Sequence, residues 1–267
     1  MRGFALGMPT LIELADLETN IELCRKLGLS FVELNMNLPS YCPQTLAPEQ
    51  LRRLRKETGI GFSLHLPEEI DLASFQPSIR KGHLDCCKEA FAWAAEAGIS
   101  IVNLHLNSGV YFSLPDRRVW LYEKYKEKFL TQVEKAFGEL VKLAQANDIA
   151  VCIENGSNFS LGFVREALES VLRASGTQLG LTWDVGHDAG VGFSDRSVFE
   201  KLQDRIGHMH LHDSDGKRDH QVLFTGKVDV PSMLDLARQL GIGVVIETKT
   251  VESLTESVRQ LNERGLR

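Results

Sequence analysis

The heptapeptide Ile206-Gly207-His208-Met209-His210-Leu211-His212 decides the fold of this chain, because its side chains alternate between polar and apolar. Residues two apart share one face of a β-strand, so Met209 and Leu211 lie on one face and the histidines lie on the other. Burying such a polar face is costly unless its groups are hydrogen-bonded or bind something. The segment therefore predicts a strand that packs its apolar face on helices and points its histidines toward a site.

The same alternation recurs in six further segments, each with one apolar face and one face that carries an acid, an amide or an imidazole. With an eighth segment near the N-terminus, the expected strands are 3–8, 31–37, 61–67, 100–107, 149–156, 179–186, 206–212 and 243–248. Helical patterns fall at 17–28, 47–58, 77–97, 117–147, 160–175, 195–204, 231–240 and 252–264. Strands that alternate with helices in this way predict a parallel sheet.

Two architectures accommodate this order, a closed barrel and a doubly wound open sheet. An open sheet usually carries a glycine-rich phosphate loop after its first strand, whereas the first strand here runs into Met8-Pro9-Thr10. The length of 267 residues suits one barrel, which typically needs about 250, and no linker divides the chain. We therefore expect an α/β fold, a single (β/α)8 TIM barrel over residues 1–267.

The composition is ordinary for a globular protein, with 43% hydrophobic and 25% charged residues. The net charge of −6 provides no global basic field for nucleic acid, and no apolar run is long enough to span a membrane. The N-terminal residues lack the apolar core of a signal peptide. Five scattered cysteines without a Cys-x-x-Cys pair indicate neither a disulfide framework nor a thiolate zinc site. We expect a cytoplasmic protein.

Most of the inward polar residues lie near the carboxyl ends of their strands, the end at which barrel active sites are found. Three of them, Glu154, Asp184 and Glu247, are carboxylates that would repel one another and raise each other's pKa. A divalent cation resolves that repulsion, so we expect these acids and His210 to bind a metal ion. For His208 and His212, taken singly, a hydrogen-bonded core histidine is the simpler interpretation.

Six motifs, in order along the chain, resemble those of the xylose-isomerase-like barrel superfamily. That superfamily contains sugar epimerases and isomerases beside the endonuclease IV family. The motifs are His65-Leu-Pro-Glu-Glu-Ile-Asp-Leu-Ala-Ser74, Val102-Asn-Leu-His-Leu-Asn-Ser-Gly109, Ile153-Glu-Asn-Gly156, Trp183-Asp-Val-Gly-His187, His208-Met-His-Leu-His-Asp-Ser-Asp-Gly216 and Ile246-Glu-Thr248. Together they are specific for the superfamily, from about residue 31 to 249, but not for one reaction.

The resemblance to the ketose 3-epimerase branch implies one metal ion, held by Glu154, Asp184, His210 and Glu247. The two glutamates, Glu154 and Glu247, would be the catalytic residues that exchange protons with the sugar while the metal stabilises an enediolate.

Contacts to the substrate are expected from four further residues. His187 and Arg218 resemble the substrate contacts of the epimerase branch. Asn35 and Asn107 carry inward amides at the same end of the barrel, and we expect them to bind substrate as well.

The endonuclease IV branch holds three zinc ions, and the resemblance implies further metal ligands. His65 and His105 match the ligands of the first ion, with Glu154 bridging to a second ion held by Asp184, His210 and Glu247. His187 and His220 match two of the three ligands of the third ion. Two residues before His220, where that branch has aspartate, this chain has Arg218. Four residues after His220, where that branch has glycine, it has Phe224. A one-residue deletion would explain both departures.

The loops favour a small substrate over nucleic acid. The segment 35–41 contains no Arg or Lys and the segment 67–71 is acidic, whereas phosphate contacts dominate the affinity for DNA. The segment 213–218 resembles that of the sugar enzymes. The sequence therefore favours isomerisation or epimerisation of a sugar or sugar phosphate, with an endonuclease IV-like zinc phosphodiesterase as the alternative.

Two further alternatives stay open. A small-substrate phosphoesterase or lyase would use His65 and His105, which a one-metal epimerase does not require. The other alternative is a non-catalytic barrel that binds a metal and a sugar. Carboxylate-rich sites suit Mn²⁺ and added imidazoles suit Zn²⁺, so the cofactor is expected to be one of these ions, in more than one copy if the histidines bind. Barrels of this kind often pair through their helices, so a homo-oligomer also stays open.

Overall fold

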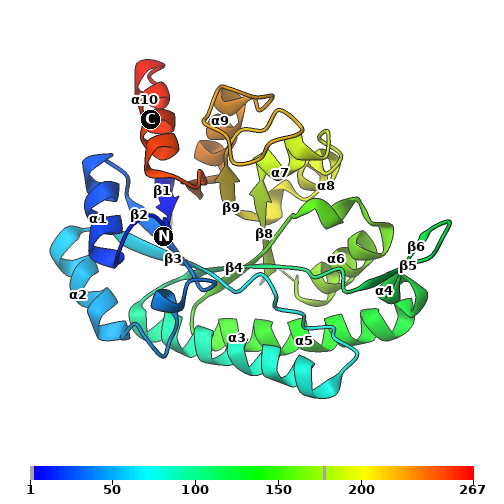
Figure 1. The fold of residues 1–267 in the computed structure, drawn as a ribbon. Helices are drawn as coiled ribbons and strands as arrows, with labels where there is room; N and C mark the ends of the chain where they lie inside the picture. Colours follow the sequence, from blue (N-terminus) through cyan, green and yellow to red (C-terminus); the bar gives the residue numbers. More distant parts are fainter. Residues whose placement is uncertain (1–2, 177–178) are drawn as a thin grey trace.

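Residues 3–176 and 179–267 are described by the structure, a computed structural model. Eight parallel strands close into a barrel, in the order β1-β2-β3-β4-β7-β8-β9-β10 and back to β1 (Figure 1). The strands are β1 (Ala5–Pro9), β2 (Phe31–Asn35), β3 (Gly61–His65), β4 (Ile101–His105), β7 (Ala150–Glu154), β8 (Leu179–Asp184), β9 (Ile206–Leu211) and β10 (Gly243–Ile246). The expected (β/α)8 barrel is confirmed. That residues 1–267 form a single domain stays a prediction.

Helices surround the strands on the outside (Figure 1). The longer ones are α1 (Leu17–Lys26), α2 (Pro48–Thr58), α3 (Pro77–Ala97), α5 (Lys126–Ala146), α6 (Gly162–Ala174), α9 (Val230–Leu240) and α10 (Val251–Glu263). Shorter ones are α4 (Leu121–Lys124), α7 (Val185–Gly190) and α8 (Arg196–Lys201), with 3₁₀ turns η1 (Pro39–Tyr41), η2 (Ser157–Ser160) and η4 (Gln203–Arg205). Helices α2 and α3 begin at a proline, whose missing N–H is harmless there, and end at left-handed glycines, Gly59 and Gly98.

The alternation of the strands sorts their side chains as the sequence predicts. Outward residues such as Leu64, Val102 and Leu104 are fully buried beneath the helices. Inward residues fill the lumen in layers, because neighbouring strands pair Glu33 with Ser63 and Thr182 with His208. The lumen therefore has a floor, a polar middle layer and a mouth.

The floor is filled by one aromatic ring. Phe31 is completely buried, and a Cβ atom added to Gly7 would lie 2.5 Å from its ring. A Cβ atom on Gly243 would lie 3.4 Å from the same ring. The absence of side chains at these two glycines gives the ring its space.

The expectation of one helix over 117–147 is wrong at its start. Arg118–Trp120 forms strand β6, which pairs antiparallel with β5 (Tyr111–Ser113) in a hairpin that projects from the barrel (Figure 1). The rings of Tyr111 and Trp120 lie 4.8 Å apart, and the Arg118 guanidinium lies 4.8 Å from the Tyr111 ring. These cross-strand contacts override the helical pattern, and α5 begins only at Lys126.

The segment 195–204, expected as one helix, divides into α8 and η4. No helix within the described ranges is both long enough and apolar enough to cross a membrane.

Candidate metal centre

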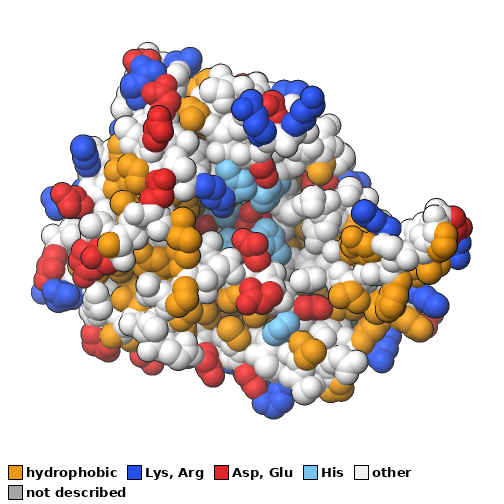
Figure 2. Space-filling model, viewed as in Figure 1, with side chains coloured by type: hydrophobic (Ala, Val, Ile, Leu, Met, Phe, Trp, Pro, Cys, Tyr) orange, Lys and Arg blue, Asp and Glu red, His pale blue; other side chains and the backbone are white. Residues whose placement is uncertain are grey.

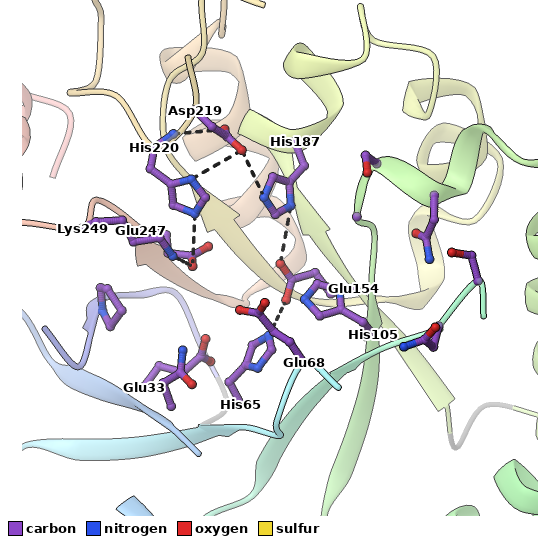
Figure 3. A pocket seen from close by; sticks show the side chains of 17 residues that line it. Glu33, His65, Glu68, His105, Glu154, His187, Asp219, His220, Glu247 and Lys249 are labelled. Atoms are coloured by element: carbon purple, nitrogen blue, oxygen red, sulfur yellow. Dashed lines mark hydrogen bonds and ion pairs between the residues drawn. The ribbon is translucent and has the colours of Figure 1, made fainter. Parts of the chain in front are cut away.

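A cavity of about 510 Å³ opens at the carboxyl ends of the strands, a size typical of small-molecule sites. Figure 2 shows imidazoles and carboxylates gathered in a central hollow of this face. Figure 3 shows the same side chains pointing toward one another from different strands and loops. Among the described residues, acids and imidazoles form four groups whose possible ligand atoms lie within 4.8 Å of one another inside each group. Three of these groups lie at the mouth, and the fourth, Glu33, His208 and His210, lies beneath them.

The central group consists of Glu154, Asp184, His210 and Glu247. Glu154 is the last residue of β7 and Asp184 is the last residue of β8. His210 lies within β9, and Glu247 follows β10 directly. The Nδ1 atom of His210 lies 3.0 Å from Glu154 Oε1, 3.0 Å from Glu247 Oε2 and 4.0 Å from Asp184 Oδ2. Glu247 Oε2 is buried and accepts no hydrogen bond. Three carboxylates, one imidazole and an unsatisfied buried oxygen are a donor set that fits a divalent cation.

The charges of the central group depend on one another. Burial raises the pKa of Glu154, but the charges of His210 and His105 outweigh it and hold the pKa well below its usual value. Burial lowers the pKa of His210, but Glu154, Glu33 and Glu247 raise it well above its usual value. Without a metal ion, a protonated imidazole thus supplies the positive charge that the carboxylates require. A divalent cation would replace that proton.

The first flanking group consists of His65, His105 and Glu154. Glu154 Oε2 lies 3.1 Å from His65 Nε2, while Glu154 Oε1 faces His210 in the central group. The rings of His65 and His105 lie 5.2 Å apart. Glu154 therefore belongs to both groups, with one oxygen facing each, and could contribute a ligand atom to each of them.

The second flanking group consists of His187, His212, Asp219 and His220. Asp219 Oδ2 lies 3.4 Å from His187 Nε2 and 3.5 Å from His220 Nδ1, and Asp219 Oδ1 lies 3.3 Å from His212 Nδ1. The Nε2 atom of His212 lies 3.0 Å from Asp184 Oδ1, which connects this group to the central one. Sequence reasoning assigned no metal to Asp219 or His212. The adjacency of Asp219 to His220 was the available signal.

Backbone conformation explains how Asp219 and His220 face the same centre although they are adjacent. His220 has a φ of +52°, in the left-handed region that non-glycine residues rarely adopt. Phe224, at the position where the endonuclease IV branch has glycine, has a φ of +67°. Asp219 supplies the carboxylate that Arg218 cannot, and the one-residue deletion that the sequence suggested stays a prediction.

The short helix α7 fixes His187 in the site. The strand expected over 179–186 ends at Asp184, because the Asp184 carboxylate accepts a hydrogen bond of 2.7 Å from the His187 N–H and caps the helix. The intervening Gly186 is required there, since a Cβ atom on it would lie 2.0 Å from the His212 ring. Asp184 thus positions His187 and also faces the central group.

Residues 21–264 match the family model described as xylose isomerase-like TIM barrel. The chain belongs to this family. Among curated proteins it is similar to two uncharacterized proteins of Methanocaldococcus jannaschii. MJ1311 is 27% identical over 231 residues, which is 82% of this chain and 75% of that protein, and MJ1614 is 24% identical over 216 residues, which is 79% and 80%.

Several solved structures have the same fold as this chain. A D-tagatose 3-epimerase-like protein superposes with a TM-score of 0.79 at 24% identity, covering 97% of this chain and 96% of that one. The TTHB071 protein from Thermus thermophilus, soaked with ZnCl₂, superposes with a TM-score of 0.71 at 26% identity, covering 98% and 99%. The IolI protein with a bound zinc atom superposes with a TM-score of 0.74 at 16% identity, covering 98% of each chain.

The residues predicted to bind substrate lie in different places in this xylose isomerase-like barrel. Asn35, Asn107 and His187 line the cavity. Arg218 does not; it lines an adjoining hollow of about 200 Å³, which His187 also borders, and pairs with Asp215 at 3.0 Å.

Lys249 lines the main cavity and was missed by the sequence analysis. Its Nζ atom lies 2.6 Å from Glu247 Oε1 (Figure 3). It is the only Lys or Arg among the described residues that line this cavity. Its spacing of two residues from Glu247 was the signal that could have identified it.

Proposed function

We propose that this protein is a divalent-metal-dependent hydrolase that cleaves a phosphate ester in a small molecule. The observation that carries the proposal is the connection of the three groups: Glu154 is shared by two of them, and Asp184 contacts the third through His212. Each group would hold one ion, Zn²⁺ being favoured by the imidazoles. When bound, such ions polarise a phosphoryl oxygen and activate water as a nucleophile.

The protein's own residues would hold and orient the substrate. The Asn35 and Asn107 amides line the cavity and can donate hydrogen bonds to an ester oxygen or to the rest of the substrate. Lys249 adds positive charge beside Glu247, where an anionic substrate would approach. The acids and imidazoles beneath them orient one another through the contacts between the groups.

The charge state of the two glutamates is consistent with the binding of metal ions for hydrolysis. An acid–base glutamate must carry a proton during part of each cycle. Burial raises the pKa of Glu247, but the charges of His210 and Lys249 outweigh it and lower it well below its usual value. Glu154 is held ionised in the same way by its histidine neighbours. Both side chains are therefore suited to bind cations.

The lining of the cavity supports a polar, charged and small substrate. Apart from Pro9, the described residues that line it are acids, amides, imidazoles, serines, one glycine and Lys249. Ligand pockets for less polar molecules are lined mainly by hydrophobic and aromatic side chains. Glu68 lies at the rim of the cavity, and with a single Lys the lining lacks the positive charge by which proteins hold a DNA backbone.

A second candidate is metal-dependent isomerisation or epimerisation of a sugar or sugar phosphate. The solved structures with this fold include a D-psicose 3-epimerase crystallised with D-tagatose, and the central group alone would hold the single ion that such a reaction requires. Glu154 and Glu247 would then exchange protons with the sugar through an enediolate. This mechanism gives no role to His65 and His105.

His105→Asn separates the two functions, because His105 belongs to the first flanking group only. We expect zinc-loaded protein to hydrolyse bis(p-nitrophenyl) phosphate or p-nitrophenyl phosphate, and the variant to lose this activity while it keeps its fold. The parallel assay follows deuterium uptake from D₂O into ketoses and sugar phosphates by NMR. If the protein cleaves no phosphate ester, and if deuterium uptake at a sugar carbon survives in His105→Asn, the hydrolase proposal is wrong and isomerisation or epimerisation takes its place.

A further inference from the structure

Glu33 is a buried acid directly beneath the central group. Its side chain is on β2, one layer below the mouth, and the residue is 3% exposed. Its Oε2 atom accepts hydrogen bonds from Ser63 Oγ at 2.8 Å and from Asn103 Nδ2 at 2.6 Å, and lies 3.1 Å from His208 Nε2. Its Oε1 atom lies 2.7 Å from His210 Nε2. A buried carboxylate thus has four partners that can all donate hydrogen bonds.

The two ring nitrogens of His210 face different neighbours. Nε2 faces Glu33, whereas Nδ1 faces Glu154 and Glu247 at 3.0 Å each. A neutral imidazole carries a proton on one nitrogen only, and the other nitrogen then has a lone pair. A carboxylate cannot donate, so in the metal-free protein the acids on both sides of the ring favour a proton on the nitrogen that faces them. Once a metal ion takes the Nδ1 side, the remaining proton is on Nε2 and faces Glu33.

We propose that Glu33 is a positioning residue that keeps the Nδ1 lone pair of His210 directed at a divalent ion in the central group. The inference rests on the metal site of the proposed function. Partners of this kind fix the ring orientation of metal-binding histidines and increase their basicity. Glu33 would act on the ion through His210.

Glu33 is better suited to this role than to that of a ligand. Glu33, His208 and His210 do lie within ligand distance of one another. However, both oxygens of Glu33 already face donors, and an ion beside them would have to displace the Ser63 and Asn103 hydrogen bonds. His210 Nε2 would also have to lose the proton that it directs at Glu33. Glu33 makes its hydrogen bonds with Ser63 and Asn103 without an ion.

The substitution Glu33→Gln tests the role, because it keeps the size of the side chain and removes its charge. The amide NH₂ would face at least one of the four donors, and against His210 it would favour the form with the proton on Nδ1. We expect affinity for Zn²⁺ or Co²⁺, measured by competition with a chelator, to fall by about 10- to 100-fold, the usual cost of losing such a partner. The Co²⁺ absorption bands of the central group should shift.

Ser63→Ala is the matched control. It removes another hydrogen bond of Glu33 but leaves His210 untouched, so its stability should fall while its metal affinity stays that of the unsubstituted protein. Equal metal affinity in the unsubstituted protein and Glu33→Gln would overturn the inference and leave the metal site standing. An unsubstituted protein that binds no ion would overturn the proposed function as well.

A second measurement needs no variant and decides the matter if Glu33→Gln does not fold. Nitrogen-15 NMR of histidine-labelled, zinc-loaded protein distinguishes the protonated ring nitrogen from the metal-bound one. We expect His210 to bind through Nδ1 and to keep its proton on Nε2. Metal bound through Nε2, or a proton on Nδ1, would overturn the inference.

Discussion

The floor and the mouth of the barrel lumen are built from the same strands but are filled in opposite ways. At the floor, the Phe31 ring fits against Gly7 and Gly243, and no charge is involved. At the mouth, carboxylates and imidazoles crowd within 4.8 Å of one another. Inward residues lie two apart along a strand, so β2 contributes Phe31 to the floor and Glu33 to the layer above it.

The difference separates residues that serve packing from residues that serve chemistry. The floor is stable as it stands, because a large side chain meets spaces left by glycines. At the mouth, the charges of the carboxylates are balanced by protonated imidazoles, and buried like charges are costly without a cation. Changes at the floor should therefore lower stability and leave metal binding unchanged. Changes at the mouth should weaken metal binding and leave the fold unchanged.

The largest effect is expected from Glu154→Gln at the mouth, since Glu154 is shared by two groups. Activity should fall by more than about 100-fold, because losing only a hydrogen-bond partner of a metal-binding histidine already costs about 10- to 100-fold. Elemental analysis should find fewer ions per chain, with an unchanged circular dichroism spectrum. Glu68→Gln, at the exposed rim of the same cavity, is the control and should keep its ions. A fully loaded and active Glu154→Gln protein would break the comparison.

The floor should give the opposite result in Gly7→Ala. The added methyl group would lie 2.5 Å from the Phe31 ring, and overpacking of this kind costs about 1–3 kcal/mol. Urea unfolding should show this loss, whereas zinc affinity of the folded protein should not change. Gly243→Ala, where the ring is 3.4 Å away, should lose less. An unchanged unfolding midpoint in Gly7→Ala would mean that the floor is not tightly packed.

The sequence predicted the fold well because the alternation of polar and apolar residues sets both the strand faces and the barrel interior. It failed at the β5–β6 hairpin, where the contact between Tyr111 and Trp120 depends on two segments meeting in space. No periodicity within one segment reports such a pairing.

For the candidate site, the sequence predicted residues by the strand ends on which they lie, and the structure brings Glu154, Asp184, His210 and Glu247 together. Their role as ligands stays a prediction. Asp219 was missed although it adjoins His220, because residue spacing does not report the left-handed backbone of His220. The partners of Glu33 could not be foreseen, since strand alternation gives the face of a residue but not its depth in the lumen.

A smaller effect is expected from pH, and only at the mouth. Burial lowers the pKa of His65, but the hydrogen bond and charge of Glu154 raise it from 6.5 to about 9. Burial likewise lowers the pKa of His212, but Asp184 raises it to about 9. A raised pKa stabilises the folded protein below the unfolded value of 6.5, and this stability is lost as the pH rises through 9.

Metal-free protein should therefore become less stable between pH 6.5 and pH 9. One pKa unit on one group corresponds to about 1.4 kcal/mol, and because these histidines share their charge with the same cluster of acids, the loss should be smaller than the sum of their separate shifts. Scanning calorimetry with a chelator measures it. With Zn²⁺ the trend should reverse, because the ion competes with these protons. Equal trends with and without Zn²⁺ would show that the histidines do not bind it.

The smallest effect is expected from a substitution of Arg218, which tests how far the substrate site extends from the mouth. Arg218 and Lys249 are cations near the same site, but the Arg218 side chain is 76% exposed and pairs with Asp215. Exposed pairs contribute about 0–1 kcal/mol, so Arg218→Met should change stability little and leave phosphate binding to the zinc-loaded protein unchanged, as titration calorimetry would measure. Lys249→Met is the comparison, and it should weaken phosphate binding because the cavity then has no lysine or arginine among its described lining residues. If Arg218→Met weakened phosphate binding as much, the adjoining hollow that Arg218 lines would belong to the substrate site, and the chemistry of the mouth would extend beyond the central cavity.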